Sequence, residues 1–217
     1  MQARLPCPRP AKAVFDGRYA RLEPLSAAHA PDLFESSTGP GAQQRFAYLF
    51  DLPPAAMADM DAWIAKASGS DDPLFSTVID RSSGRATGRQ ALMRITPEHG
   101  VIEIGNILWG PAISRTRVAT EALYLAARHV FEDLGYRRFE WKCNDLNEPS
   151  KAAAKRFGFS YEGLFRQHMW AKGANRDTAW FSMLDSEWPG FRREYDRWLE
   201  PSNFDAAGRQ KSKLRVL

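Results

Sequence analysis

The chain has 217 residues, of which 44% are apolar and 26% are charged, and this is enough to bury one globular core. No apolar run approaches the roughly 20 residues of a membrane-spanning helix, so no membrane partner is expected. The formal net charge of +4 suits an anionic ligand. A basic composition alone does not indicate nucleic-acid binding, and no nucleic-acid partner is expected.

The placement of cysteine and histidine residues argues against a disulfide-rich protein and against a metal-binding protein. Cys7 and Cys143 are too few for a disulfide framework and fit a reducing cytoplasm, where we expect the protein to be located. The four histidines have no metal-ligand spacing, so no metal is expected. Residues 1–16 are proline-rich without the apolar stretch of a signal peptide, which predicts a flexible lead-in. Residues 201–217 form a basic tail that we expect to be frayed, and one domain should span 17–200.

The first half of the chain predicts two helices and four strands. Alternating apolar and polar residues indicate the strands, three of which follow one another as a meander. Ser26 is the expected N-cap of the first helix, and prolines are tolerated in the first turn of the second. In chain order we expect a strand over 19–25, helices over 27–36 and 53–67, and strands over 74–80, 87–95 and 101–109.

The apolar spacing then changes to three and four residues. This predicts a long helix over 117–134, followed by a strand and a helix with Asn147 as N-cap. The final helical segment carries four aromatic residues, which favour packing against the sheet over forming a ligand cage. The expected elements are a strand over 136–143, a helix over 148–157, hairpin strands over 159–170 and 179–184 around the turn KGANRD, and a helix over 188–200. Antiparallel strands followed by one β-α-β crossover predict an α+β fold with helices on both faces of a mixed, mostly antiparallel sheet.

The strand over 101–109 leads through a short loop into the helix that begins at Arg117. This geometry points the backbone N–H groups of residues 115–120 into open space, with the helix dipole behind them, and so predicts a phosphate site. Arg115 and Arg117 would add positive charge. The alternative is an ordinary turn with solvated arginines.

Three motifs fall in the order of a known family. They are EIG at Glu103–Gly105, TEAL at Thr120–Leu123 and NEPSKAAAKRFGF at Asn147–Phe159. Together they resemble the core of the GNAT acyltransferases, most closely the branch of ribosomal-protein N-terminal acetyltransferases. The resemblance is strongest over residues 102–163 and implies the GNAT fold, in which the fourth strand bulges and splays from the fifth to admit the cofactor.

The resemblance also implies how acetyl-CoA, the cosubstrate, would bind. The bulge would lie at Gly105–Asn106, since glycine permits the required backbone angles. Arg117 replaces the family's loop glycine, and its side chain would either add charge or crowd the pyrophosphate. The implied contacts are Ile107, Leu108 and Trp109 to the pantetheine arm, Arg115, Thr116, Arg117, Val118, Ala119 and Thr120 to the pyrophosphate, Asn147 to the pantetheine amide and Lys155 to the adenosine 3′-phosphate.

For catalysis the resemblance implies two side chains. Glu103 would act as the base that deprotonates the amine, and Ser150 as the acid that protonates the leaving thiolate. The alternatives are a solvent-facing carboxylate and an ordinary first-turn serine. Many members of the family carry a tyrosine that protonates the leaving thiolate, and Ala154 occupies that position here. Cys143 is expected to be inert packing, because direct transfer is the family's usual mechanism.

The sequence therefore predicts an acetyl-CoA-dependent N-acetyltransferase acting on a primary amine of a protein N-terminus or a small molecule. The alternative is a non-catalytic acyl-CoA-binding or partner-binding module on the same fold. The lost loop glycine and the absent tyrosine favour that alternative, whereas Glu103, Asn147 and Ser150 count against it. The sequence does not choose the acceptor, nor between a monomer and a homodimer.

Overall fold

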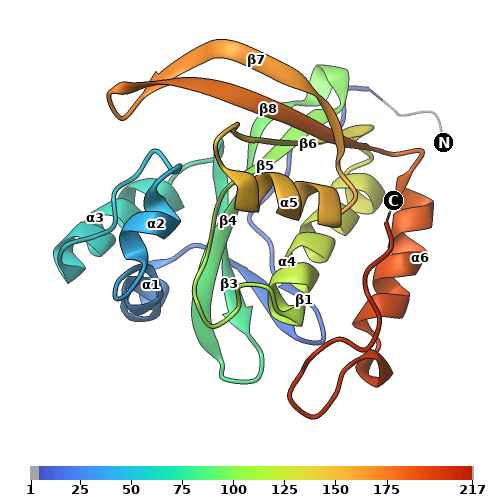
Figure 1. Cartoon of the computed structure of the whole chain (residues 1–217), viewed down its shortest axis with the longest axis horizontal. Helices are drawn as coiled ribbons and strands as arrows, with labels where there is room; N and C mark the ends of the chain where they lie inside the picture. The colour runs from blue at the N-terminus through green and yellow to red at the C-terminus, as the bar shows by residue number, and fades with distance from the viewer. Residues whose placement is uncertain (1–4, 217) are drawn as a thin grey trace. The chain divides into compact units, whose positions relative to one another are not determined.

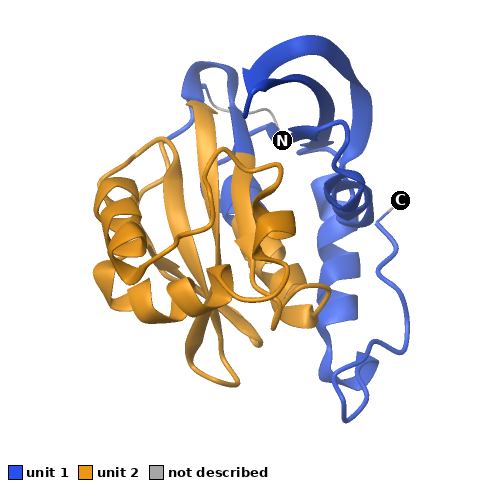
Figure 2. Cartoon of the chain, turned by 60° about the vertical axis from the view of Figure 1, so that its left-hand side comes forward, with its two compact units in different colours: residues 1–8, 96–103, 127–217 blue, residues 9–95, 104–126 orange. Residues whose placement is uncertain are grey.

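The computed structural model describes residues 5–216, which divide into two compact units that interleave along the chain (Figure 2). Of these residues, unit 1 contains 5–8, 96–103 and 127–216, and unit 2 contains 9–95 and 104–126. The single domain over 17–200 stays a prediction.

The fold class is a mixed α/β protein with a mostly antiparallel sheet, as predicted. The strands are β1 (Phe15–Asp16), β2 (Ala20–Pro24), β3 (Leu74–Asp80), β4 (Arg85–Thr96), β5 (Val101–Trp109), β6 (Arg138–Asn144), β7 (Ser160–Ala171) and β8 (Ala174–Leu184). Among the described residues they hydrogen-bond in the order β1-β2-β3-β4-β5-β6-β8-β7. The pairs β1–β2, β2–β3, β3–β4, β6–β8 and β7–β8 are antiparallel.

The helices differ from the prediction mainly at their ends. They are α1 (Ala30–Ser37), α2 (Ala42–Phe46), α3 (Met57–Ser68), α4 (Arg117–Arg128), α5 (Glu148–Arg156) and α6 (Trp188–Leu199), with short 3₁₀ turns at 27–29, 97–99 and 201–203. The predicted helix over 53–67 begins four residues late, because Pro53 and Pro54 belong to the loop before it. The predicted helix over 117–134 continues beyond α4 as a π-helical turn over 129–133.

Unit 2 places α1, α2 and α3 together beside β3 and β4 (Figure 1). Apolar side chains of α1 and α3 form a buried cluster with those of β3 and β4. Trp63 and Phe75 pack edge to face at its border, with ring centroids 5.3 Å apart. The buried members are Leu25, Ala30, Leu33, Met60, Ile64, Ala67, Ile79 and Ala86. These helices are thereby fixed against the sheet face.

Unit 1 contains the long β7–β8 hairpin and α6. The hairpin turn is only Lys172 and Gly173, so the predicted KGANRD turn is wrong: β8 already begins at Ala174. Three of the four predicted α6 aromatics, Trp188, Tyr195 and Trp198, are buried, and Trp188 stacks on Phe131 of the π-helical turn. Tyr195 is fully buried, and its hydroxyl donates to the Phe157 carbonyl at 3.0 Å.

Both ends of the described chain are packed, which corrects the predictions of a flexible lead-in and a frayed tail. The Cys7 N–H donates to the Pro97 carbonyl at 3.0 Å, and the Cys7 side chain is buried. In the tail, the Lys211 N–H donates to Asn203 at 2.7 Å, and Val216 is buried. Main-chain hydrogen bonding, which composition does not report, holds both segments. Residues 1–4 and 217 of these predictions lie outside the described residues.

Two observations on residues 5–216 concern membranes and metals. None of the helices in this range is both long and apolar enough to cross a bilayer. Within the same range no three His, Cys, Asp or Glu side chains are grouped to hold a metal ion.

Candidate functional site

The start of α4 in unit 2 lies where the sequence predicts a phosphate site. Arg115 adopts a left-handed φ of 63°, and Thr116 caps the helix, its hydroxyl accepting the Val118 N–H at 3.2 Å. The Thr116 N–H itself donates to Ile113, and the Thr120 N–H to the Thr116 carbonyl. Three of the six predicted donors therefore have acceptors within unit 2, and a bound phosphate would compete with these for the N–H groups.

The side chain of Arg117 packs on an aromatic ring. Its guanidinium carbon lies 4.3 Å from the centroid of the Tyr19 ring, which is a cation–π distance. Tyr19 is held by the buried carboxylate of Glu121, which accepts the N–H groups of Arg18, Tyr19 and Ala20 at 2.8, 2.5 and 2.6 Å. Tyr19 holds the Arg117 side chain in this position. The contact therefore favours the alternative in which Arg117 adds positive charge near the loop over the one in which it crowds the pyrophosphate.

The β5 segment shows a local break where a bulge is predicted. The left-handed residue is Asn106, with a φ of 49°, and not Gly105, since asparagine tolerates this region better than most non-glycine residues. After Asn106, the backbone of β5 lies very close to that of β4. A Cβ added at Gly88 would lie 2.7 Å from the Leu108 carbonyl oxygen and 3.0 Å from the Trp109 Cα. Gly88 is therefore required for this approach.

Glu103 lies in a buried charge cluster of unit 1. The Lys142 ammonium contacts Glu103 at 3.0 Å and Glu140 at 2.7 Å, and it lies 3.8 Å from the Trp180 ring centroid. Arg138 contacts Glu140 at 2.8 Å. The solvent-facing alternative for Glu103 is wrong, because the residue is 4% exposed. Lys142 is not among the residues predicted from the sequence, although its alternation with Glu140 along one strand is a signal for a shared face.

Ser150 belongs to a second cluster on β6. Asn147 caps α5 as predicted, its side-chain oxygen accepting the Ser150 N–H at 3.2 Å. The Trp141 indole donates to the Ser150 hydroxyl oxygen at 3.0 Å, a contact that sequence analysis missed. The indole thereby fixes the position of the Ser150 oxygen, and the Ser150 hydroxyl also bonds with Cys143. The catalytic role of Ser150 stays a prediction.

Cys143 has the environment of an inert thiol. Burial raises the pKa of its thiol, and a hydrogen bond with Ser150 only partly opposes this effect. A protonated thiol is a poor nucleophile. This agrees with the expectation of a packing role.

The two predicted catalytic residues contact opposite faces of β6. Successive side chains of a strand point to alternate faces, so Lys142 and Trp141 lie on different sides. Glu103 contacts Lys142, and Ser150 contacts Trp141. The structure thus links both residues to one strand without bringing them into contact with each other.

The family follows from comparison with known proteins. The family model described as "Acetyltransferase (GNAT) domain" matches residues 20–160. The chain belongs to this GNAT acetyltransferase family. A solved GCN5-related N-acetyltransferase from Brucella melitensis is 58% identical, with a TM-score of 0.96, over 99% of this chain and 97% of that one. The class of enzyme indicated for the chain is therefore acyltransferase, as the sequence predicted.

Two curated GNAT relatives match shorter stretches. The uncharacterised N-acetyltransferase p20 of Bacillus licheniformis is 30% identical over 118 residues, which are 52% of this chain and 64% of that protein. YdaF of Bacillus subtilis, named as a candidate ribosomal N-acetyltransferase, is 32% identical over 73 residues, 34% of this chain and 40% of its own length. The chain thus spans less than two thirds of either curated relative.

Lys155 of this GNAT chain borders a strongly basic cavity in unit 1. The cavity has a volume of about 670 Å³ and lies between the end of α5 and the C-terminal segment. Figure 1 shows that segment running beside α6. Among residues 5–216, no acidic side chain lines the cavity. Five cationic side chains line it. They are Lys155, Arg156, Lys211, Lys213 and Arg215. The last three are not predicted from the sequence, because residues 201–217 were expected to be frayed.

Proposed function

We propose that the chain is an acetyl-CoA-dependent N-acetyltransferase that transfers the acetyl group directly to a primary amine. The observation that carries the proposal is the oriented Ser150 hydroxyl on one face of β6, with the buried Glu103 cluster on the other. Attack on a thioester needs a proton acceptor on the side of the amine and a proton donor on the side of the sulfur. The two clusters supply one group of each kind.

The proposed reaction assigns each proton to a named atom. Acetyl-CoA supplies an acyl group activated as a thioester. The Glu103 carboxylate accepts a proton from the acceptor ammonium, directly or through water, and the amine nitrogen then forms the new C–N bond as the C–S bond breaks. The Ser150 hydroxyl donates its proton to the departing sulfur, while Trp141 holds the Ser150 oxygen in place. The new amide nitrogen releases its second proton to solvent, and the Ser150 oxygen takes a proton back from solvent. Trp141 is thus a positioning residue.

The proposed cosubstrate contacts follow the chain order of the family. The backbone of Ile107, Leu108 and Trp109 would bind the pantetheine arm, and the separation of β5 from β6 stays a prediction. The start of α4 would bind the pyrophosphate through residues 115–120, where the helix dipole favours an anion. Asn147 would bind the pantetheine amide. Lys155 would bind the 3′-phosphate, and the basic lining of its cavity supports an anionic ligand there.

The assignment of Glu103 is tested by two matched variants. Glu103 and Glu140 both contact Lys142, but only Glu103 is proposed to accept a proton. We expect Glu103→Gln to lower kcat by roughly 10²–10⁴-fold and to remove the acidic limb of the pH–rate profile. Glu140→Gln should keep that limb. Equal effects of the two variants in a thiol-release assay would assign Glu103 a purely structural role.

The same assay separates the enzyme from a non-catalytic module. We expect thiol release with acetyl-CoA to depend on added primary amine and to fall in Ser150→Ala. In Trp141→Phe, kcat should fall with little change in the KM for acetyl-CoA, because only the orientation of the Ser150 hydroxyl is lost. Tight CoA binding without turnover on any amine would instead support the module.

A further inference from the structure

Unit 2 contains a cavity of about 360 Å³ among α1, α2, α3 and β4. Its volume lies in the range of small-molecule sites. Most of the lining is apolar or aromatic and includes Leu33, Phe46, Leu52, Met60, Trp63 and Leu108. Leu108 lies on β5, in the segment proposed to bind the pantetheine arm. The cavity therefore borders the strand where the acyl group would be presented.

A buried arginine lines this cavity. Arg89 of β4 is 4% exposed, and its Nη2 contacts Asp51 at 2.6 Å. Its guanidinium carbon lies 3.9 Å from the Trp63 ring centroid. The Nη1 atom is buried and has no hydrogen-bond partner among residues 5–216. A buried N–H donor without an acceptor is rare in folded proteins, and a ligand is one physical explanation for it.

The charge balance decides which ligand group would suit Arg89. Arginine stays cationic in proteins, so the Arg89–Asp51 pair is formally neutral. The lining also contains Asp59, so its formal charge is −1, which suits the ammonium of the acceptor and makes a ligand carboxylate costly. A neutral carbonyl oxygen would accept the Nη1 proton without that cost. The apolar and aromatic side chains of the lining fit an apolar or aromatic group of the ligand beside its carbonyl.

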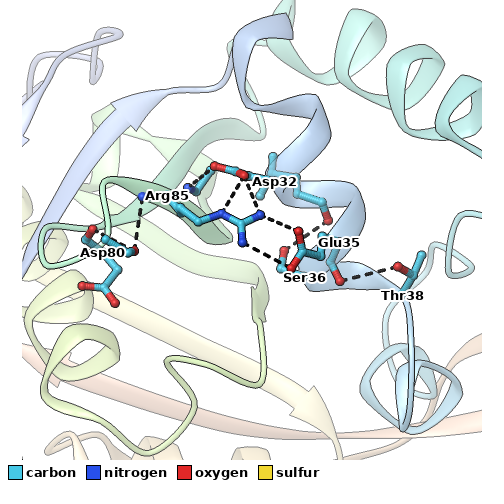
Figure 3. Close-up of polar contacts among 9 residues, drawn as sticks. Asp32, Glu35, Ser36, Thr38, Asp80 and Arg85 are labelled. Carbon is cyan, nitrogen blue, oxygen red and sulfur yellow. Dashed lines mark hydrogen bonds and ion pairs between the residues drawn. The ribbon is translucent and has the colours of Figure 1, made fainter.

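The wall that α1 contributes is fixed to the sheet, as Figure 3 shows. Arg85, at the start of β4, donates to Asp32 at 2.8 and 2.9 Å and to Glu35 at 2.5 and 3.2 Å. Asp32 also accepts the Ala86 N–H at 2.9 Å. Ser36 of the same helix lines the cavity. The cavity is therefore bounded by elements that are tied together, which is typical of a preformed site.

We propose that this cavity binds the acceptor, and that the acceptor is an apolar α-amino amide whose carbonyl oxygen accepts a hydrogen bond from Arg89. The inference rests on the proposed acetyl transfer and adds the class of amine. Both a small aminoacyl amide and the first residue of a peptide carry this chemistry. Free amino acids, whose carboxylates are ionised, bind less well.

Four small amines test the chemistry by calorimetry in the absence of acetyl-CoA. Phenylalaninamide has both features, phenethylamine lacks the carbonyl, phenylalanine carries a carboxylate, and glycinamide lacks the ring. We expect phenylalaninamide to bind about tenfold more tightly than phenethylamine, as one hydrogen bond to a charged group predicts. Equal affinities would overturn the inference. A pentapeptide amide that begins with phenylalanine distinguishes a peptide source from a small-molecule source.

Variants locate the site. The double variant D51L/R89M removes both charged partners, so neither is left buried alone, and it should bring phenylalaninamide and phenethylamine to similar affinities. Ala55 is exposed and lines the cavity, whereas its exposed neighbour Ala56 is outside the described lining. Ala55→Phe should therefore weaken binding of all the aromatic amines, and Ala56→Phe should not. Identical binding by the two phenylalanine variants would overturn the location.

Turnover measured with the same amines separates the two proposals. Binding of phenylalaninamide without acetyl transfer would contradict the proposed function and support the pocket. Equal acetyl transfer to glycinamide and phenylalaninamide would support the proposed function and contradict the pocket.

Discussion

Replacing Glu121 by glutamine tests the anchor at the start of α4. The Glu121 carboxylate is buried and accepts three backbone N–H groups, those of Arg18, Tyr19 and Ala20, at 2.5 to 2.8 Å. Hydrogen bonds to a charged group contribute about 1.5–3 kcal/mol each, and neutral ones about 1 kcal/mol. Glutamine keeps one carbonyl oxygen and turns an NH₂ group toward the remaining donor. We therefore expect the free energy of unfolding to fall by about 3 kcal/mol.

Urea denaturation followed by fluorescence measures this loss. Thermal denaturation is a second measurement: for a chain of this size, a loss of about 3 kcal/mol should lower the melting temperature by roughly 6–12 °C. Glu35→Gln is the matched control, because the Glu35 side chain is 69% exposed and its pairing with Arg85 is a solvent-screened surface ion pair that should contribute little stability. Similar losses in the two variants would refute the reasoning that the three buried N–H groups depend on the Glu121 charge.

Three further outcomes are expected. Gly88→Ala should lower the free energy of unfolding by about 2 kcal/mol or more, since the added Cβ overlaps the Leu108 carbonyl oxygen; unchanged denaturation would contradict the close approach of β4 and β5. Cys143→Ala should retain acetyl transfer, because burial raises the pKa of the thiol; loss of turnover in the thiol-release assay would make it a nucleophile. The hydrogen bond from Arg138 lowers the pKa of Glu162 against the effect of burial. The stability that Glu162 contributes is therefore present above about pH 4.3 and lost as the pH falls through the lower folded-state value. Glu162→Gln should show a shallower loss of urea stability in this acidic range than the wild type, and an identical pH profile would contradict the assignment.

Local patterns predicted the long elements well. Apolar residues spaced three and four apart located α4 because one of its faces is buried, and Asn147 indicated the start of α5 through its cap. The five residues of α2 are too few for such a pattern to appear. The polar run after Gly173 predicts a loop, yet it forms the exposed start of β8, because strand pairing does not need apolar side chains.

The chemistry of the site depends on contacts that no local pattern contains. Lys142 meets Glu103 from 39 positions away, and Arg89 meets Asp51 from 38. Alternation along β4 suggests a solvent-facing side chain at Arg89, but α3 covers it and makes a polar residue part of a cavity wall. The family motifs predicted where the candidate groups lie along the chain. Burial and long-range pairing, which decide their chemistry, required the structure.

The interleaving of the two units has a consequence for synthesis on the ribosome. Residues 5–8 are made before the rest of unit 1, yet the residues that they join, including Pro97 and Gly135, emerge about 90 and 130 positions later. The backbone N–H and the thiol of Cys7 therefore cannot form these contacts until residues 9–95 have left the ribosomal exit tunnel. A bulky fusion placed directly before Leu5 would lie beside these delayed contacts, whereas the β7–β8 turn at Lys172–Gly173 is exposed and joins strands that are neighbours in sequence. Labels and tethers placed in that turn would therefore interfere little with the order in which the chain closes.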